Sequence, residues 1–253
     1  MHIVFLHGFM GAPREFLWLA ASMSCPTEMI SLPGHGCSDA RVTFDNAGDW
    51  LEEQLIGLKV KECVLYGYSL GGRIALNYVL NQSRPKVKVK GLILESAAIG
   101  LADKNEAKER QKADHVWAEN FLTQPMVDTL SKWYQQPVFA DLNDEDRKFM
   151  IKQKANLNGA RMADCLEDLS LGRMPFFGPM LKQLDLPVLF LHGSRDEKFK
   201  KIGTQLTGYQ NPNLVVKEIP KAGHNCHFAN MSAVIANTKD FLLATNLIPA
   251  NND

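Results

Sequence analysis

The segment Gly67–Gly72, which reads GYSLGG, has the residue types and spacing of a reactive serine site. It follows the apolar run Cys63–Tyr66 and opens a helical pattern over Leu70–Leu80. Glycines on both sides of a serine permit a sharp turn from strand to helix, which leaves the serine hydroxyl exposed at a sheet edge. The helix N-terminus behind the turn favours negative charge at the same place. We therefore predict that Ser69 carries the reactive hydroxyl.

Two downstream loops offer the base and the acid that a serine hydroxyl needs at neutral pH. His224 follows the last apolar run of the chain, and Asp196 follows the run before it. His224 would accept the proton of Ser69, while Asp196 would orient the imidazole and stabilise its protonated form. His227 is a rival base. Asp185 is a rival acid, but it precedes its strand and therefore lies at the opposite end of the sheet.

Negative charge that develops on a substrate oxygen needs backbone N–H donors beside the serine. The N–H of Leu70 is one candidate, because this residue directly follows Ser69. The second donor is expected in the loop of residues 7–11 (HGFMG), and Phe9 is the best candidate there. Each such donor contributes about 10²–10³ in rate. His7, in the same loop, is predicted to be a structural residue at a strand end.

The arrangement of apolar runs predicts an α/β fold with a mostly parallel central sheet flanked by helices. Six short runs bounded by glycine or proline have the length of buried strands: Ile3–Leu6, Thr27–Leu32, Cys63–Tyr66, Gly91–Glu95, Pro187–Leu191 and Leu214–Ile219. Helical stretches such as Asp45–Leu58 lie between them. Residues 101–184 read as helical and contain no such run. They are predicted to form a helical cap inserted into a core of residues 1–100 and 185–253.

The composition excludes several classes of protein. Hydrophobic residues make up 45% of the chain, and 28 basic residues balance 28 acidic ones, so a general nucleic-acid-binding surface is not expected. No apolar stretch approaches the roughly 18 residues of a membrane span, and no signal peptide is visible. Five scattered cysteines without CxxC spacing argue against a disulfide framework and favour the cytoplasm. Residues 224–227 (HNCH) lack further metal ligands, so neither a metal nor another cofactor is predicted, and oligomeric state is left open.

The chain resembles the α/β-hydrolase superfamily along nearly its whole length, in the pattern HGF…LPGHG…GYSLGG…HGSRD…AGHN. The order Ser69, Asp196, His224 is that of this superfamily. Within it, the chain resembles the 2-succinyl-6-hydroxy-2,4-cyclohexadiene-1-carboxylate synthase family of menaquinone biosynthesis. The segments that carry this closer resemblance are GYSLGGR (67–73), ERQ (109–111), WYQQPVFA (133–140) and GHNCH (223–227). WYQQPVFA discriminates best, because a generic esterase has no reason to carry it in its cap.

The resemblance implies a lyase rather than a hydrolase. The family eliminates pyruvate from 2-succinyl-5-enolpyruvyl-6-hydroxy-3-cyclohexene-1-carboxylate to give 2-succinyl-6-hydroxy-2,4-cyclohexadiene-1-carboxylate. Ser69, activated by His224, would remove a ring proton without forming an acyl-enzyme. The oxyanion hole would stabilise charge on the succinyl carbonyl.

The implied substrate is a small tricarboxylate, which a chain of zero net charge must neutralise locally. Arg73 lies four residues after Ser69, and Arg110 shares a helix face with aromatic residues, so both are predicted to bind carboxylates. Lys154 occupies the place where the family usually has an arginine, and it keeps the charge without the planar guanidinium. Tyr68 and Trp133 are predicted as pocket walls.

The same triad also suits other activities. A carboxylesterase or thioesterase would use Ser69 as a nucleophile and form an acyl-enzyme, and a hydrolase of C–C bonds is a closer rival. A non-enzymatic binding protein of this fold would commonly lack a triad member. The predicted arginines favour the lyase, because a neutral ester does not require them. Arg195 and Lys198 flank Asp196 and are predicted to be solvated loop charges.

Overall fold

The computed structural model describes residues 1–36 and 41–248. Its centre is a six-stranded parallel sheet with the order β2-β1-β3-β4-β5-β6. The strands are β1 (His2–Leu6), β2 (Thr27–Ile30), β3 (Glu62–Tyr68), β4 (Lys88–Glu95), β5 (Val188–Gly193) and β6 (Leu214–Ile219). Each predicted apolar run forms one of these strands. The predicted fold class is therefore confirmed.

Alternation of side chains along the strands divides the core between the two faces of the sheet. In β1, Val4 and Leu6 face one apolar cluster, whereas Ile3 and Phe5 face the other. The first cluster includes residues of four helices: α2 (Ala47–Gly57), α3 (Leu70–Asn81), α8 (Gly178–Lys182) and α9 (Glu197–Gly208). The second includes residues of α1 (Leu17–Ala21) and α11 (Met231–Ala244). The sheet is thus covered on both faces, as a parallel sheet requires.

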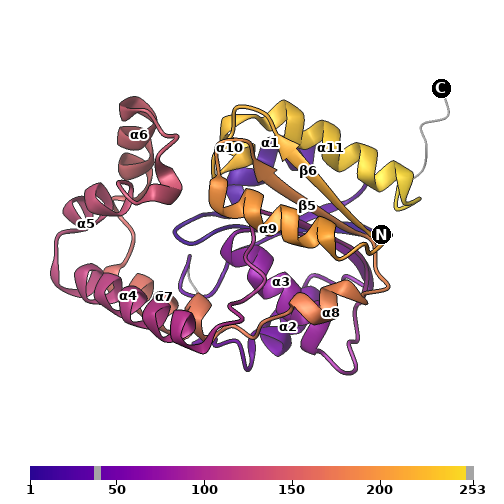
Figure 1. Cartoon of the computed structure of the whole chain (residues 1–253), viewed down its shortest axis with the longest axis horizontal. Coiled ribbons are helices and arrows are strands. Elements are labelled where there is room, and N and C mark those ends of the chain that lie inside the picture. The colour runs from indigo at the N-terminus through magenta and orange to yellow at the C-terminus, as the bar shows by residue number, and fades with distance from the viewer. Residues whose placement is uncertain (37–40, 249–253) are drawn as a thin grey trace.

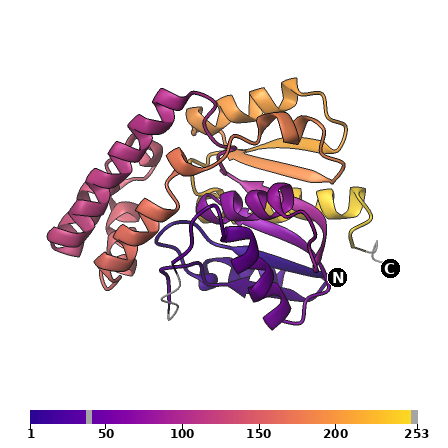
Figure 2. The same ribbon diagram turned by 90° about the horizontal axis from the view of Figure 1, so that it is seen from below.

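The segment of residues 101–184, all of which are described, contains helices and no strand. Four of its helices lie together beside the sheet rather than on its faces, on the side to which the arrowheads of β5 and β6 point (Figures 1 and 2). They are α4 (Lys104–Thr123), α5 (Met126–Trp133), α6 (Asp144–Lys154) and α7 (Gly159–Asp168). Their apolar side chains form a third cluster that also includes Met10. From Leu169 onward, the chain packs again with the sheet.

Further features of the described residues bear on function. None of the described helices is long and apolar enough to cross a membrane. Within the same residues, no group of three or more His, Cys, Asp or Glu side chains is arranged to hold a metal ion. The described cysteines are free thiols, namely Cys25, Cys63, Cys165 and Cys226, and Cys37 lies outside the described residues.

Candidate active site

Ser69 lies in the turn between β3 and α3, in a strained backbone conformation. Its φ is +49° and its ψ is −108°, a region that non-glycine residues rarely adopt. The turn is tight because glycines allow close backbone contacts. A Cβ atom on Gly67 would lie 2.4 Å from the Cα of Gly72, and one on Gly71 would lie 2.2 Å from the carbonyl oxygen of Leu6. The glycines of GYSLGG therefore permit the tight turn that carries Ser69, which is partly buried.

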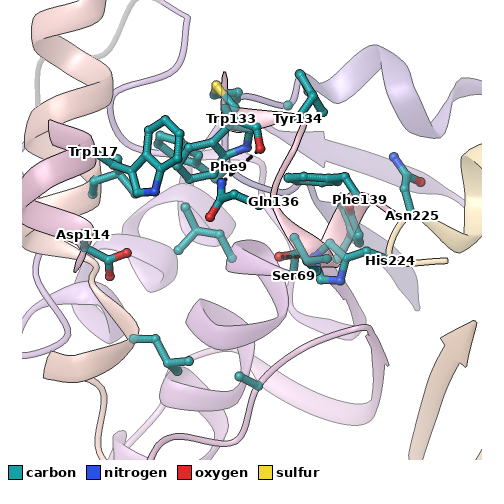
Figure 3. Close-up of a pocket in the computed structure, with 18 of the residues that line it drawn as sticks. Phe9, Ser69, Asp114, Trp117, Trp133, Tyr134, Gln136, Phe139, His224 and Asn225 are labelled. Atoms are coloured by element: carbon teal, nitrogen blue, oxygen red, sulfur yellow. Dashed lines mark hydrogen bonds between the residues drawn. The ribbon is translucent and has the colours of Figure 1, made fainter. Parts of the chain in front are cut away.

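The three residues predicted to form a triad lie in one hydrogen-bonded row. His224 Nε2 is 3.1 Å from Ser69 Oγ, and His224 Nδ1 is 3.2 Å from Asp196 Oδ2. Asp196 is 5% exposed, and its other oxygen accepts the N–H of Phe199, so that it also caps α9. Figure 3 shows Ser69 and His224 side by side at the cavity. In this geometry the imidazole can take the hydroxyl proton while the carboxylate holds the ring.

The loop after β1 packs on the serine turn, and buried histidines join it to the segment of residues 32–35. A Cβ atom on Gly8 would lie 2.6 Å from the Tyr68 ring, so the loop must approach closely here. His7 Nε2 accepts the N–H of Leu32 at 3.0 Å, and His35 Nε2 accepts the N–H of Met10 at 2.8 Å.

Burial lowers the pKa of His7 to about 3, with a further contribution from His35. Burial also lowers the pKa of His35 to about 4. Both rings therefore stay neutral and accept hydrogen bonds, a structural role like the one predicted for His7. Phe9 lies in the loop that they hold. Leu70 is the first residue of α3 and so has an N–H without an intrahelical acceptor.

A cavity of about 390 Å³ opens above Ser69 and His224. Its walls include Phe9, Leu70 and Tyr68 from the core, and the Tyr68 ring lies 5.5 Å from that of His224. Most of the WYQQPVFA segment lines the same cavity: Trp133, Tyr134, Gln136, Pro137, Val138 and Phe139. In Figure 3, Trp117 and Asp114 of α4 lie on one side of the cavity and Ser69 and His224 on the other. The conspicuous sequence segment is therefore part of the pocket.

The three predicted cations all line this cavity, but their surroundings differ. Arg73 donates to the Leu169 carbonyl at 2.8 Å. Burial, followed by the charge of Arg110, lowers the pKa of Arg73 to about 10. Arg110 is paired with Asp114 at 2.8 Å. The ammonium of Lys154 has two partners inside the protein and is described further below.

Several pocket residues were not predicted as site residues. Glu15, Asp114 and Asp141 bring carboxylates to the cavity, and no sequence signal marks them. Lys198 also lines the cavity. It is exposed, as predicted, but it lies in helix α9 and not in a loop. Its position two residues after Asp196, in the first turn of α9, is the signal that was available.

His227, the rival base, is engaged elsewhere. Its Nδ1 lies 2.9 Å from the carboxylate of Glu95, and the ring is only 3% exposed. Its main-chain N–H also donates to Glu95 at 2.9 Å. Asp185, the rival acid, is bonded to Asn213 and precedes β5, away from the serine turn. The structure therefore brings Ser69 together with His224 and not with His227.

Asp141 lies against the loop that carries His224. A Cβ atom built on Gly223 would lie 2.0 Å from Asp141 Cγ and 2.1 and 2.2 Å from its oxygens. Burial raises the pKa of Asp141, while hydrogen bonds from its own N–H and that of Gly223 partly oppose the rise. The segment of residues 101–184 and the loop of His224 thus meet at a contact for which only glycine leaves room.

We expect Gly223→Ala to lower kcat/KM by about tenfold or more, because the methyl group must push Asp141 or the His224 loop aside. Asp141→Ala removes the obstacle, so the double variant should recover most of the loss in a steady-state assay. Gly208→Ala is the matched control, since nothing lies within 4 Å of its Cβ position. A double variant as impaired as Gly223→Ala alone would contradict the prediction.

Comparison with known proteins gives the family. Residues 3–238 match the model of the Alpha/beta hydrolase family. The 2-succinyl-6-hydroxy-2,4-cyclohexadiene-1-carboxylate synthase of Yersinia enterocolitica is 36% identical over 98% of this chain and 88% of that protein. The chain belongs to this synthase family. The Serratia proteamaculans member is 38% identical over 95% of this chain and 92% of its own length.

A solved structure agrees with membership of the synthase family. The structure described as MenH from S. aureus has a TM-score of 0.88 and 29% sequence identity, over 97% of this chain and 94% of that chain. The resemblance inferred from GYSLGGR, WYQQPVFA and GHNCH is therefore confirmed at the level of the family. The roles of individual residues stay predictions.

Proposed function

We propose that this member of the synthase family eliminates pyruvate from 2-succinyl-5-enolpyruvyl-6-hydroxy-3-cyclohexene-1-carboxylate, yielding 2-succinyl-6-hydroxy-2,4-cyclohexadiene-1-carboxylate. The identity of 36–38% to curated synthases over nearly the whole chain carries this proposal. The row of Ser69, His224 and Asp196 at the cavity supports it with a base that such a reaction requires. No cofactor enters the reaction proposed here.

The elimination begins with removal of a ring proton by the Ser69 oxygen, whose own proton passes to His224 Nε2. The C–H electron pair forms a double bond beside the succinyl carbonyl, the existing ring double bond shifts to the carbon that bears the enolpyruvyl oxygen, and the bond to that oxygen breaks. The departing enolate takes up the proton held by His224 and becomes pyruvate. Asp196 stabilises the imidazolium that forms. Base catalysis of this kind contributes about 10²–10⁴ in rate.

The backbone N–H groups of Phe9 and Leu70 hold the charge that develops on the succinyl carbonyl. Such donors act in a site that the surrounding walls shield from water, where they are worth more than in bulk solvent. Trp133 and Tyr68 enclose the ring, and Arg73 and Arg110 bind carboxylates. The helices α4–α7 serve as the cap that completes the pocket. An acyl-enzyme has no part in this sequence of steps.

The proposal is tested by measuring pyruvate release from the enolpyruvyl substrate beside hydrolysis of p-nitrophenyl acetate, with one enzyme preparation. We expect rapid pyruvate release above the spontaneous rate and slow ester cleavage, because the pocket cations favour a tricarboxylate over a neutral ester. Fast ester cleavage without pyruvate above background would overturn the lyase and favour a carboxylesterase that uses the same triad.

A further inference from the structure

We propose that Lys198, and not Lys154, supplies the third positive charge that holds the carboxylates of the substrate. This inference rests on the proposed function, because it assigns a contact for the tricarboxylate substrate. It changes the role of Lys154 from binding to positioning. Three observations carry it, namely the partners of Lys154, the place of Lys198 on the cavity wall and the charges around it.

Lys154 has its charge satisfied inside the protein. Its ammonium donates to the carbonyl of Met10 at 2.7 Å and pairs with Glu15 at 3.3 Å, and the residue is 9% exposed. Met10 in turn donates its N–H to His35 and belongs to the loop that carries Phe9. Lys154 therefore joins helix α6 to the loop of the oxyanion hole. A substrate carboxylate at this ammonium would have to compete with Glu15.

Lys198 stands in a different environment. It lies in the first turn of α9 and lines the cavity, and its Nζ is 5.6 Å from the centroid of the Phe199 ring. The Phe199 ring packs on His224, with 4.8 Å between the ring centroids. Lys198 therefore lies beside the hydrogen-bonded row of the proposed triad. Among the described residues, no carboxylate pairs with Lys198 within 4.0 Å, so its ammonium can donate hydrogen bonds to a carboxylate of the substrate.

Two further cations of the cavity, Arg73 and Arg110, act on Lys198. Burial, then Arg110, then Arg73 lower the pKa of its ammonium. Asp196 and Asp114 oppose this effect, but Asp196 is engaged with His224 and Asp114 with Arg110. Three cations that repel one another around one cavity are best stabilised by a bound anion with more than one negative charge.

The distinction between the lysines is tested with Lys198→Met, Lys154→Met and the control Lys201→Met, which alters another lysine of α9. We expect Lys198→Met to raise KM for the tricarboxylate roughly 10- to 100-fold, and to change p-nitrophenyl acetate cleavage much less. Lys154→Met should lower kcat for both substrates, because the loop that carries Phe9 and Met10 loses its hydrogen bond to α6. Lys201→Met should resemble the wild type.

An unchanged KM in Lys198→Met, or equal losses on both substrates, would overturn the inference. A failure of the proposed function would be recognised by a different result, namely that the wild-type enzyme releases no pyruvate. In that case calorimetric titration with citrate, a tricarboxylate probe, replaces the kinetic readout. Binding that weakens in Lys198→Met and persists in Lys201→Met would support the anion site, whereas equal binding to both, or none to the wild type, would overturn it.

Discussion

Replacing Ser69 with alanine is expected to slow pyruvate release by about 10²–10⁴-fold, the contribution of a positioned general base. The hydroxyl lies 3.1 Å from His224 Nε2 and is the atom that would take the ring proton. The imidazole that remains also lines the cavity, but Asp196 holds it with its Nε2 3.1 Å from the position of the lost hydroxyl, so it replaces the serine poorly. Single-turnover pyruvate release, corrected for spontaneous decay of the substrate, measures the loss.

The fold should be unaffected by this change. Alanine at φ +49° bears the same backbone strain as serine, and Ser69 Oγ makes no helix-capping hydrogen bond. The matched control is Ser131→Ala, in which the lost hydroxyl lies on an exposed face of α5 and bonds only to the Val127 carbonyl. Circular dichroism spectra and thermal unfolding curves should coincide for the wild type, Ser69→Ala and Ser131→Ala. Full activity in Ser69→Ala would show that another group is the base.

Replacing Glu95 with alanine is expected to lower the free energy of unfolding by about 3–5 kcal/mol, the usual effect of removing one partner of a buried ion pair. Glu95 lies at the end of β4 and is fully buried. It accepts the Tyr66 hydroxyl at 2.6 Å, as well as the ring and main-chain N–H groups of His227 at 2.9 Å. The variant leaves these donors buried without an acceptor.

Urea unfolding at about pH 6 measures this loss, since the pH then lies between the ordinary pKa values of glutamate and histidine, about 4.3 and 6.5. Glu62→Ala is the control, because Glu62 is exposed at the start of β3. It should change stability by less than about 0.5 kcal/mol. A Glu95→Ala protein as stable as this control would contradict a structural role for the pair.

The stability that the pair contributes should also depend on pH. Burial is the largest influence on His227 and lowers its pKa, but the charge and hydrogen bonds of Glu95 outweigh it, so that the pKa is raised. The contribution of His227 to stability is complete below the ordinary histidine pKa, and it is lost as the pH rises through the raised pKa of His227.

For Glu95, burial is again the largest single influence and raises the pKa, yet His227 and Tyr66 together lower it. Its contribution is complete above the ordinary glutamate pKa and is lost as the pH falls through the lowered value. The difference in unfolding free energy between wild type and Glu95→Ala should therefore be largest from about pH 4.3 to 6.5 and shrink on both sides. A difference that is flat with pH would show that the pair is not ionised.

The sequence by itself determined the sheet and the serine turn. All six apolar runs form strands, because a strand buried on both faces needs a short continuous apolar segment, and that pattern is local. The sharp turn at Ser69 follows equally from neighbouring glycines. Since parallel strands end at one edge of the sheet, the positions of Asp196 and His224 after their strands were enough to predict that they lie near Ser69.

Only the tertiary structure decided which charges face the pocket and which are already paired. Lys154 meets Met10 across 144 positions of sequence, and His227 meets Glu95 across 132. Periodicity gives the face of a helix on which a side chain lies, but not the partner that another element brings to it. The closeness of Asp141 to Gly223 depends in the same way on how residues 101–184 pack beside the sheet. Those contacts arise from side-chain packing between distant segments, for which no local sequence pattern exists.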